Sequence, residues 1–288
     1  MPSLRSIKRR IASIINTRQI TRAMKMVAAA KFKRAQESLL RIRPYAISTY
    51  DILDDLASRI DITSHPLLSR REPKRVELVI MTSDRGFCGA FNSNIIRYAE
   101  NFIKENAGKY ESITFSCIGK KGRDYFRRKN YNLRREFVKV FDNVNFEIAL
   151  DISNDLIDNF LSANLDEIIL IYNEFKSVIQ QRVTSLTLLP IIPKPRAEKV
   201  YLVDYIYEPS KEEVLNDLIP RCLAIEVYRA LIESAASEFG ARMTAMENAT
   251  NSASEMIDIL TLKYNRARQA AITKELSEII TGAEAVKK

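Results

Sequence analysis

The C-terminal part of the chain carries a seven-residue repeat that restricts the fold more than any other feature. From about Ser210 to Gly282 the sequence has one proline, Pro220, and one internal glycine, Gly240. Two series of mainly apolar residues interleave there at alternating intervals of four and three. They are Ile232, Phe239, Met246, Ala253, Leu260 and Ala267, and Ala236, Met243, Thr250, Ile257, Tyr264 and Ala271. This spacing is the seam of a coiled coil, and its alanines let a partner helix come close.

A helix of this length needs a partner. About 70 residues that rise ~1.5 Å each span roughly 100 Å, which no domain of this size can bury. The N-terminal segment is the other long helix, because Ser3 can cap it and apolar residues recur along it. These residues are Leu4, Ile7, Ile11, Ile14, Ile20, Met24, Val27, Leu39 and Ile42. We expect Pro44 to kink or briefly interrupt this helix, and we predict that the two ends of the chain form an antiparallel pair.

The middle of the chain has a different pattern, in which short β-branched runs alternate with amphipathic stretches. The expected strands are residues 76–82, 112–119, 136–141, 166–175 and 183–192, and the expected helices are residues 92–106, 122–130 and 146–163. Such alternation is typical of a mainly parallel, Rossmann-like sheet flanked by helices. The last two strands leave no room for a helix between them, so they should form an antiparallel hairpin. The segment IPKPRAEK that follows is expected to be a linker.

These patterns predict an α/β fold combined with a long antiparallel coiled coil. The expected domains are an N-terminal coiled-coil helix over 1–60, an α/β domain over 75–195 and a C-terminal coiled-coil helix over 209–288. The last of these ends in a distinct tip, because the seam stops after Ala271 and its next positions are Lys274 and Glu278. The apolar stripe continues instead through Ile272, Leu276, Ile279 and Ala283. This face needs a socket on another protein.

The positive charge of the chain lies at its N-terminus. The net charge is +9, but residues 1–43 contain twelve Lys and Arg against Glu37 alone, a net of +11, and the remainder sums to −2. A basic block of this kind normally binds an acidic partner, which can be nucleic acid, anionic lipid or acidic protein loops.

Several classes of function are disfavoured by composition. The three cysteines, Cys88, Cys117 and Cys222, are scattered without metal-ligand spacing, so we expect free thiols in a reducing cytoplasm. His65 is the only histidine, which argues against histidine catalysis and metal binding. The longest apolar runs are far shorter than the ~20 residues of a membrane span. The N-terminus lacks the apolar core of a signal peptide.

The loop TSDRGFCGAFN, residues 82–92, stands where phosphate sites are built, between an expected strand and an expected helix. It matches neither G-x-x-x-x-G-K-[ST] nor G-x-G-x-x-G. We therefore interpret it as a turn in which Gly86 and Gly89 supply unusual backbone angles, and we expect no nucleotide cofactor and no catalytic residue there.

Three stretches make the chain resemble a known family. The tip ITKELSEIITGAEAV, the N-terminal NTRQITRAMKMVAAAKFKRAQ and the loop TSDRGFCGAFN are similar to the gamma subunits of F-type ATP synthases. Because the three lie at both ends and in the middle, the resemblance covers essentially the whole chain. It implies a central rotor shaft, one per complex, that turns inside a ring of alternating alpha and beta subunits and couples proton flow to ATP synthesis or hydrolysis. The foot of the shaft is fixed to epsilon and to the membrane ring of c subunits.

The resemblance also implies where in the cell the protein acts and that it has no catalytic role. A non-catalytic subunit of this kind is peripheral to the cytoplasmic face of a bacterial inner membrane and carries no cofactor or metal. No transit peptide precedes Met1, which favours a bacterium over an organelle. The chloroplast members carry an inserted redox-active cysteine pair that this sequence lacks, so thiol regulation is not expected.

The resemblance assigns contacts to individual residues, each with a simpler alternative. The residues for which it implies contact with beta subunits are Met24, Lys25, Arg85, Cys88, Arg268, Gln269, Thr273 and Glu275. The residues that it places at the foot of the shaft are Tyr205, Tyr207 and Glu208. The alternative for Met24 and Lys25 is an ordinary coiled-coil position, and for Arg268 and Gln269 a solvated helix face. The alternative for the foot residues is packing at the base of the α/β domain.

The competing function is a basic coiled-coil protein that binds nucleic acid or a membrane surface. The charge block supports it, but Phe32 is the only aromatic residue among residues 1–43, which is poor for stacking on single strands. Nonspecific phosphate binding would show a steep salt dependence. A Rossmann-type enzyme is disfavoured by the missing fingerprint and the lack of a general base.

Overall fold

The computed structural model describes residues 3–57, 65–162, 165–177, 181–192, 208 and 210–286. The chain divides into two compact units. The central unit is Ala29–Arg242, and the terminal unit combines Met1–Ala28 with Met243–Lys288. Two continuous helices contribute to both units, α1 (Leu4–Ala57) and α5 (Lys211–Val286). Each unit is considered below by itself.

The central unit contains one five-stranded sheet. Its strands are β1 (Arg75–Met81), β2 (Ser112–Ile118), β3 (Leu133–Phe137), β4 (Glu167–Phe175) and β5 (Gln181–Leu189). The spatial order is β3-β2-β1-β4-β5, in which β5 pairs antiparallel to β4 and every other pair is parallel. The predicted mainly parallel sheet with a C-terminal hairpin is confirmed.

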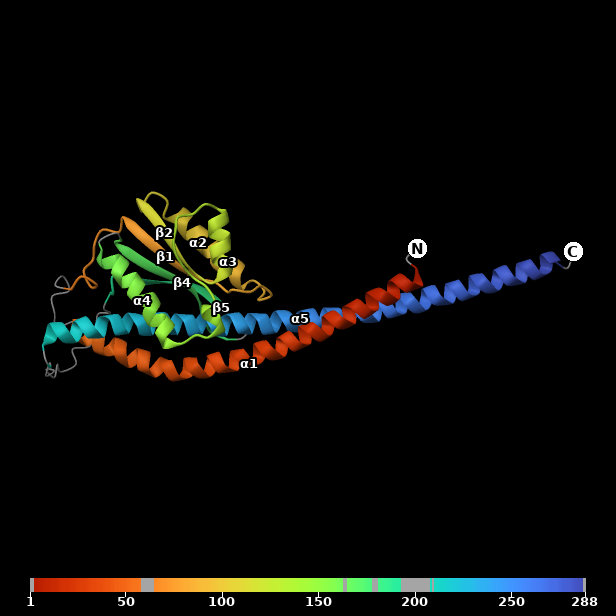
Figure 1. Ribbon diagram of the computed structural model, residues 1–288, viewed down its shortest axis with the longest axis horizontal. Helices are drawn as coiled ribbons and strands as arrows, with labels where there is room; N and C mark the ends of the chain where they lie inside the picture. The colour runs from red at the N-terminus through yellow and green to blue at the C-terminus, as the bar shows by residue number, and fades with distance from the viewer. Residues whose placement is uncertain are drawn as a thin grey trace. The chain divides into compact units, whose positions relative to one another are not determined.

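Both faces of the sheet are covered, because alternate residues of its central strands enter two different cores (Figure 1). On one face, Leu78 and Ile80 pack with residues of α2 (Phe91–Glu105) and α3 (Lys120–Arg128). On the other face, Val79 and Met81 share a core with α4 (Phe146–Leu161) and with α1 and α5. Burial on both faces explains why β1 is a nearly continuous apolar run.

The third strand lies earlier than the sequence predicted. The expected strand was 136–141, whereas β3 ends at Phe137 and Lys139 adopts a left-handed conformation with φ of 64°. Val140 and Phe141 are buried in a short 3₁₀ turn, η2 (Val140–Asp142), rather than in a strand. Their apolar character reflects this packing, which a periodicity argument cannot distinguish from a strand.

The N-terminal helix is not interrupted at Pro44. A single helix runs from Leu4 to Ala57 with Pro44 inside it, so of the two expected effects, a kink or a brief interruption, the interruption is wrong. Proline removes one backbone hydrogen bond, but Ala46 and Leu53 beyond it are buried, and their packing keeps the helix in place. The expected linker lies almost entirely outside the described residues.

The heptad seam of α5 is confirmed by its burial. In the central unit Ile232, Ala236 and Phe239 are buried. In the terminal unit Met246 and Ala253 are buried, and the remaining seam positions are half-buried while most of their neighbours are exposed. These half-buried positions are Met243, Thr250, Ile257, Leu260, Tyr264, Ala267 and Ala271.

The matching face of α1 differs from the predicted one between residues 18 and 28. Ile20 and Val27, expected on this face, are 60% and 59% exposed. Polar residues occupy the face instead. The Thr21 and Thr250 hydroxyls hydrogen-bond at 2.8 Å, and the Lys25 ammonium lies 2.7 Å from the Glu247 carboxylate. A prediction that followed apolar residues alone therefore shifted to the wrong side of the helix here.

Asp166, directly before β4, hydrogen-bonds the backbone where the chain enters β1. The residue is 6% exposed, and its carboxylate accepts hydrogen bonds from the backbone N–H groups of Lys74 and Arg75 and from the Arg75 guanidinium. Burial alone would raise the pKa of this carboxyl, but the Arg75 side chain and the two N–H donors outweigh it, and the pKa lies below its ordinary value. The ionised form therefore stabilises the sheet.

We predict that Asp166→Asn lowers the free energy of unfolding by about 1–3 kcal/mol at neutral pH, because it removes charge-assisted hydrogen bonds without changing shape. A carboxyl with a lowered pKa contributes above its unfolded-state pKa of about 3.9, and the contribution is lost as the pH falls through the folded-state value. Urea unfolding at pH 7 and at pH 3 should show that the difference in free energy of unfolding between variant and wild type is smaller at pH 3. An equal difference at both pH values would contradict this account.

A second prediction concerns the close approach of the helices. Ala28 is 2% exposed on the seam face of α1, and Ala23 is exposed on the same helix. We expect Ala28→Leu to destabilise the isolated chain by about 1–3 kcal/mol, since added methyl groups would force the helices apart. Ala23→Leu is the matched control and should change stability by less than about 0.5 kcal/mol. If urea unfolding showed similar losses of stability in the two variants, the assignment of Ala28 to the seam would be wrong.

Candidate functional site

The loop of residues 82–92, called the glycine loop, joins β1 to α2 and is built as a rigid turn. Gly89 has a φ of +56°, in the region that favours glycine, as predicted. Gly86 does not adopt such an angle. The second left-handed residue is Phe87, with a φ of 63°. An aromatic residue with positive φ is a conformational outlier, which indicates that surrounding contacts impose this geometry.

The polar side chains of the glycine loop bond to one another. Asn92 Oδ1 accepts from the Ser83 backbone N–H at 2.9 Å, and the Ser83 hydroxyl donates to the Arg85 carbonyl at 2.6 Å. Asn92 Nδ2 lies 3.2 Å from the Cys88 sulfur. Ser83 and Cys88 are buried. The loop is thus held by internal hydrogen bonds, which fits the interpretation of a structural turn.

Asp84 ties this loop to the two neighbouring loops at the same edge of the sheet. Its Oδ1 accepts from the backbone N–H groups of Lys120 and Lys139, each at 3.1 Å. The backbones at Gly119 and Thr82 lie close together, since a Cβ added to Gly119 would lie 1.9 Å from the Thr82 carbonyl oxygen. The glycine loop therefore has little freedom to move relative to the sheet.

Arg242 fastens the glycine loop to α5. Its Nη2 donates to the carbonyls of Arg85 and Gly86, at 3.4 and 3.3 Å, and also lies 2.6 Å from Glu238 Oε1. The Arg242 side chain is 13% exposed and that of Glu238 4%. Burial raises the pKa of Glu238, and the Arg242 guanidinium opposes that shift.

The two residues of this loop that the family resemblance assigns to a partner contact differ in their exposure. The Arg85 side chain is 73% exposed and can reach a partner. Cys88 is 2% exposed, and burial raises the pKa of its thiol, so its side chain serves the loop rather than an open surface. Phe87 is 73% exposed and was missed by the sequence analysis. The sequence offered one signal for it, because Phe87 is an aromatic residue between the two glycines of a turn.

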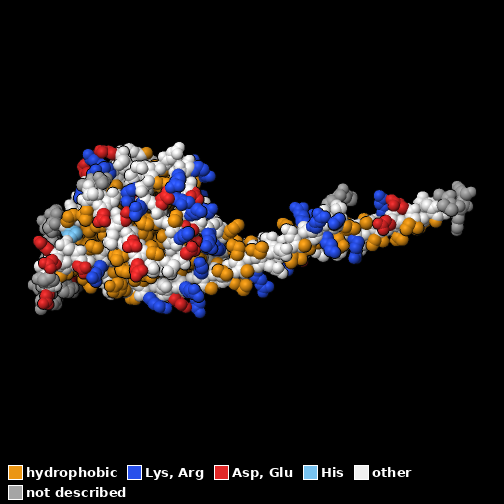
Figure 2. Space-filling view, in the orientation of Figure 1, with side chains coloured by type: hydrophobic (Ala, Val, Ile, Leu, Met, Phe, Trp, Pro, Cys, Tyr) orange, Lys and Arg blue, Asp and Glu red, His pale blue; other side chains and the backbone are white. Residues whose placement is uncertain are grey.

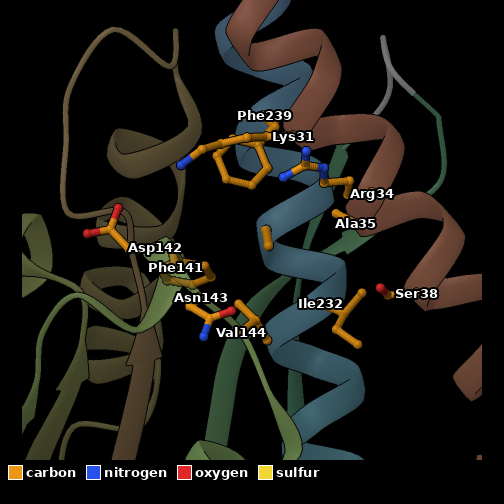
Figure 3. A pocket seen from close by; sticks show the side chains of 11 residues that line it. Lys31, Arg34, Ala35, Ser38, Phe141, Asp142, Asn143, Val144, Ile232 and Phe239 are labelled. Carbon is orange, nitrogen blue, oxygen red and sulfur yellow. The ribbon is translucent and has the colours of Figure 1, made fainter.

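A pocket of about 270 Å³ lies between α1, the turn η2 and α5 in the central unit (Figure 3). Lys31 and Arg34 bring charge to it, and Ile232, Phe141 and Phe239 bring apolar surface. It contains no paired catalytic carboxylates and no nucleophile next to a base. Across the described part of the chain there is also no cluster of three metal-ligating side chains.

The tip of α5 is uncovered in the terminal unit, where orange apolar side chains follow its end (Figure 2). Ile272, Leu276 and Ile279 are 49%, 55% and 67% exposed, and Ala283 is exposed too. Ile280, which the sequence analysis did not select, is 60% exposed. The predicted apolar stripe therefore has no cover among the described residues of this chain.

The end of the seam has a geometric cause. Thr21 meets Thr250 and Lys25 meets Glu247. Because the helices are antiparallel, each step toward the N-terminus of α1 is matched by a step toward the C-terminus of α5, and Leu4 lies opposite about residue 267. The first turn of α1 thus comes level with the last seam positions, and beyond them α5 has no partner helix among the described residues.

The remaining predicted contact residues fall in three places. Met24 and Lys25 are half-buried on α1. The residues at the start of the tip, all exposed on α5, are Arg268, Gln269, Thr273 and Glu275. Glu208 is exposed, and Tyr205 and Tyr207 lie outside the described residues. Within the described ranges, no helix has the length and hydropathy needed to cross a membrane.

Comparison with known proteins gives a consistent result. A family model described as ATP synthase matches residues 3–286. An ATP synthase gamma chain from Anaeromyxobacter sp. (strain Fw109-5) is 51% identical over 290 residues and all of both chains. One from Geobacter metallireducens is 47% identical over 287 residues, again covering both chains completely.

Solved structures share the fold. A chain of the central stalk and c-ring of the Tetrahymena thermophila mitochondrial ATP synthase matches with a TM-score of 0.63 and 33% identity, covering 80% of this chain and 99% of that one. A chain from the Euglena gracilis mitochondrial enzyme gives a TM-score of 0.70 at 20% identity, covering 98% and 94%. The family match spans nearly the whole sequence, and the bacterial relatives are about half identical throughout. The chain therefore belongs to the ATP synthase gamma chain family.

Proposed function

We propose that this chain is the central rotor shaft of a bacterial F-type ATP synthase. In this role it has no catalytic site of its own. It couples proton-driven rotation to conformational changes in the catalytic beta subunits as they synthesise or hydrolyse ATP. Its partners are the ring of alpha and beta subunits, the epsilon subunit and the c-subunit ring, and one copy is present per complex. The complex holds it at the cytoplasmic face of the inner membrane.

The uncovered tip of α5 is the observation that carries this proposal. The helix is packed along its seam up to Ala271, and the stripe Ile272, Leu276 and Ile279 follows directly with each side chain about half exposed or more. An apolar face of this kind, repeated along a helix, requires a cover. A sleeve made by the surrounding ring supplies that cover, and an apolar contact without directional bonds leaves the helix free to turn.

The coupling follows from the asymmetry of the chain. A shaft whose faces differ makes different contacts with each of several identical catalytic subunits, and it biases each toward a different nucleotide affinity. The bias cannot exceed the difference in contact free energy between the states. Rotation then moves the bias from one subunit to the next. The charge of +11 over residues 1–43 suits acidic loops on those subunits, because long-range attraction holds a shaft without interlocking it.

The residues proposed for these contacts keep the roles that the family resemblance assigns them. Met24, Lys25, Arg85, Arg268, Gln269, Thr273 and Glu275 contact beta subunits. Cys88 belongs to the same group by supporting the glycine loop from inside. Tyr205, Tyr207 and Glu208 form the foot, and Ile272, Leu276, Ile279 and Ala283 form the bearing.

The test is reconstitution with the alpha and beta subunits of the same organism. We expect a stable complex with a single copy of this chain, in which ATP hydrolysis turns a bead attached to its foot. A complex that excludes the chain would overturn the proposal. If the chain instead bound DNA or anionic vesicles with a steep salt dependence and ignored both subunits, the competing nucleic-acid or membrane-surface function would be supported.

We predict that replacing both Arg268 and Gln269 by alanine slows ATP turnover of the reconstituted complex. Both side chains are exposed on α5 just before the apolar stripe. Loss of a charge-assisted hydrogen bond made in one catalytic state removes about 1.5–3 kcal/mol. Turnover should fall by roughly tenfold or more, at ~1.4 kcal/mol per decade.

The control is a chain that ends after Thr281. It lacks Gly282 and the short tail but keeps Ile272, Leu276 and Ile279, so its turnover should fall much less. Both complexes are compared at saturating ATP after their subunit composition has been confirmed. If the truncated chain were the more damaged of the two, the polar contacts would have been assigned to the wrong part of the tip.

A further inference from the structure

We propose that a buried polar network around Glu77 fixes the register of the edge strand β3, and that Arg134 positions the glycine loop through this strand. The network, called the Glu77 network, consists of Glu77 on β1, Ser116 on β2, Arg134 on β3, and Asp155 and Asn159 on α4. None of these residues carries a role in the sequence analysis. The inference concerns contacts inside the central unit, so it goes beyond the proposed function and needs no partner subunit.

Glu77 is a carboxylate buried between the sheet and α4. It is 0% exposed, and the alternation of a strand directs it to the same face as Val79, which packs in the core with α4. Its Oε1 accepts from the Ser116 hydroxyl and from Arg134 Nε, the latter at 2.9 Å. Its Oε2 accepts from Asn159 Nδ2 at 2.9 Å. Both carboxylate oxygens are therefore satisfied, by donors from β2, β3 and α4.

Arg134 connects this carboxylate to a second one on α4. Its Nη2 donates to Asp155 Oδ2 at 2.6 Å, and its side chain is 24% exposed. Burial alone would lower the pKa of Arg134, but the carboxylates of Asp155 and Glu77 outweigh burial and raise the pKa above its ordinary value. The guanidinium thus stays charged and bridges the sheet and the helix.

A β-bulge brings Arg134 to this position. Phe115 of β2 pairs with Leu133, but the next residue of β2 pairs with Arg135. Arg134 is therefore an extra residue in β3, and both arginines reach α4, since Arg135 Nε lies 3.4 Å from Asp155 Oδ1. Bulges are rare in parallel pairs, and they redirect side chains. This bulge places two consecutive arginines on the same face of the sheet.

The bulge also decides which face the rest of β3 presents to each core. Leu133 packs in the core with α2 and α3, whereas Phe137, four residues later, packs in the core with α4. An uninterrupted strand directs residues four apart to the same face, so without the bulge one of these two side chains would leave its core. Because β3 is an edge strand paired only with β2, the sheet alone does little to fix its register.

The Glu77 network disfavours both registers that a β3 without the bulge could take. In the first, Arg134 turns to the face of α2 and α3 and leaves the buried Glu77 without its cation. In the second, Glu136 turns toward α4 and loses its ion pair with Arg127 of α3, and Phe137 leaves its core. A buried carboxylate without a partner is costly, which selects the bulged register.

The register of β3 determines where the glycine loop is held. The Phe137 carbonyl accepts from the Gly119 backbone N–H at 2.7 Å. Two residues further along, the Lys139 backbone N–H donates to Oδ1 of Asp84 in the glycine loop, at 3.1 Å. A change of register in β3 would move this N–H group away from Asp84, which would keep only its bond from Lys120.

The first test measures stability and hydrogen exchange on the full chain. Arg134→Met removes the cation beside a buried carboxylate, so the melting temperature should fall by roughly 6–20 °C. The Lys139 amide should exchange about tenfold faster relative to the amide of Ile95, which is fully buried on α2 and reports unfolding of the central unit. Arg221→Met is the matched control, because Arg221 is 66% exposed in a surface pair with Asp217, and neither value should change.

A double variant separates positioning from charge balance. Combining Glu77→Gln with Arg134→Met leaves no unpaired buried charge, because the glutamine amide can bond to both Ser116 and Asn159. The melting temperature should return to within about 4 °C of wild type. Exchange at Lys139 should nevertheless stay fast relative to Ile95, because no guanidinium holds the bulge against α4.

The outcomes decide the proposal without reference to any partner. A recovered melting temperature with fast exchange at Lys139, and an unchanged Arg221→Met, would support it. If the double variant also recovered slow exchange at Lys139, the two charges would only neutralise each other and the positioning role would be refuted. Wild-type values in Arg134→Met would refute it as well. Whether the chain assembles with alpha and beta subunits bears on the proposed function and not on this result.

Discussion

The packing of α5 against α1 is the contact on which the other features depend, because a long helix in water is stable only where one of its faces is covered. In the central unit residues 230–240 are buried without a break, so α5 is covered on all sides. In the terminal unit it is covered mainly at the heptad positions, and from Ile272 to Ala283 every residue is exposed. Burial along one continuous helix therefore falls from all faces to one face to none. The proposed bearing residues Ile272, Leu276, Ile279 and Ala283 lie where it reaches none, and Arg268 and Gln269 lie just before that point.

Much of this fold could be predicted from sequence, because periodicity reports which side of an element is covered. The heptads of α5 and the end of its seam were predicted correctly, and so was the parallel sheet with its final hairpin. The errors have a common cause. Ile20 and Val27 are apolar but exposed, whereas Thr21 and Lys25 are polar but lie in the seam, since their partners Thr250 and Glu247 are polar too. An apolar pattern cannot report a contact made by polar groups.

The candidate site was less predictable than the fold, because it depends on contacts between distant parts of the chain. Sequence sufficed to exclude a phosphate-binding fingerprint in the glycine loop. It could not show that Cys88 is buried and Phe87 exposed, because the orientation of both follows from a left-handed backbone that Arg242 helps to hold. Arg242 stands more than 150 residues further along the chain. No local pattern connects the two.

The ion pairs of α5 in the central unit are formed within the helix, and one of them stands next to the glycine loop. Arg229 pairs with Glu226 and Glu233, and Arg242 with Glu238, so each pair lies within a single face of the helix. Buried ion pairs seldom add much stability, and burial raises the pKa of both Glu233 and Glu238. The Nη2 of Arg242 that lies 2.6 Å from Glu238 Oε1 is also the donor to the carbonyls of Arg85 and Gly86, so this ion pair sits directly beside the loop backbone. Arg242 thereby links α5 to the backbone just before Phe87.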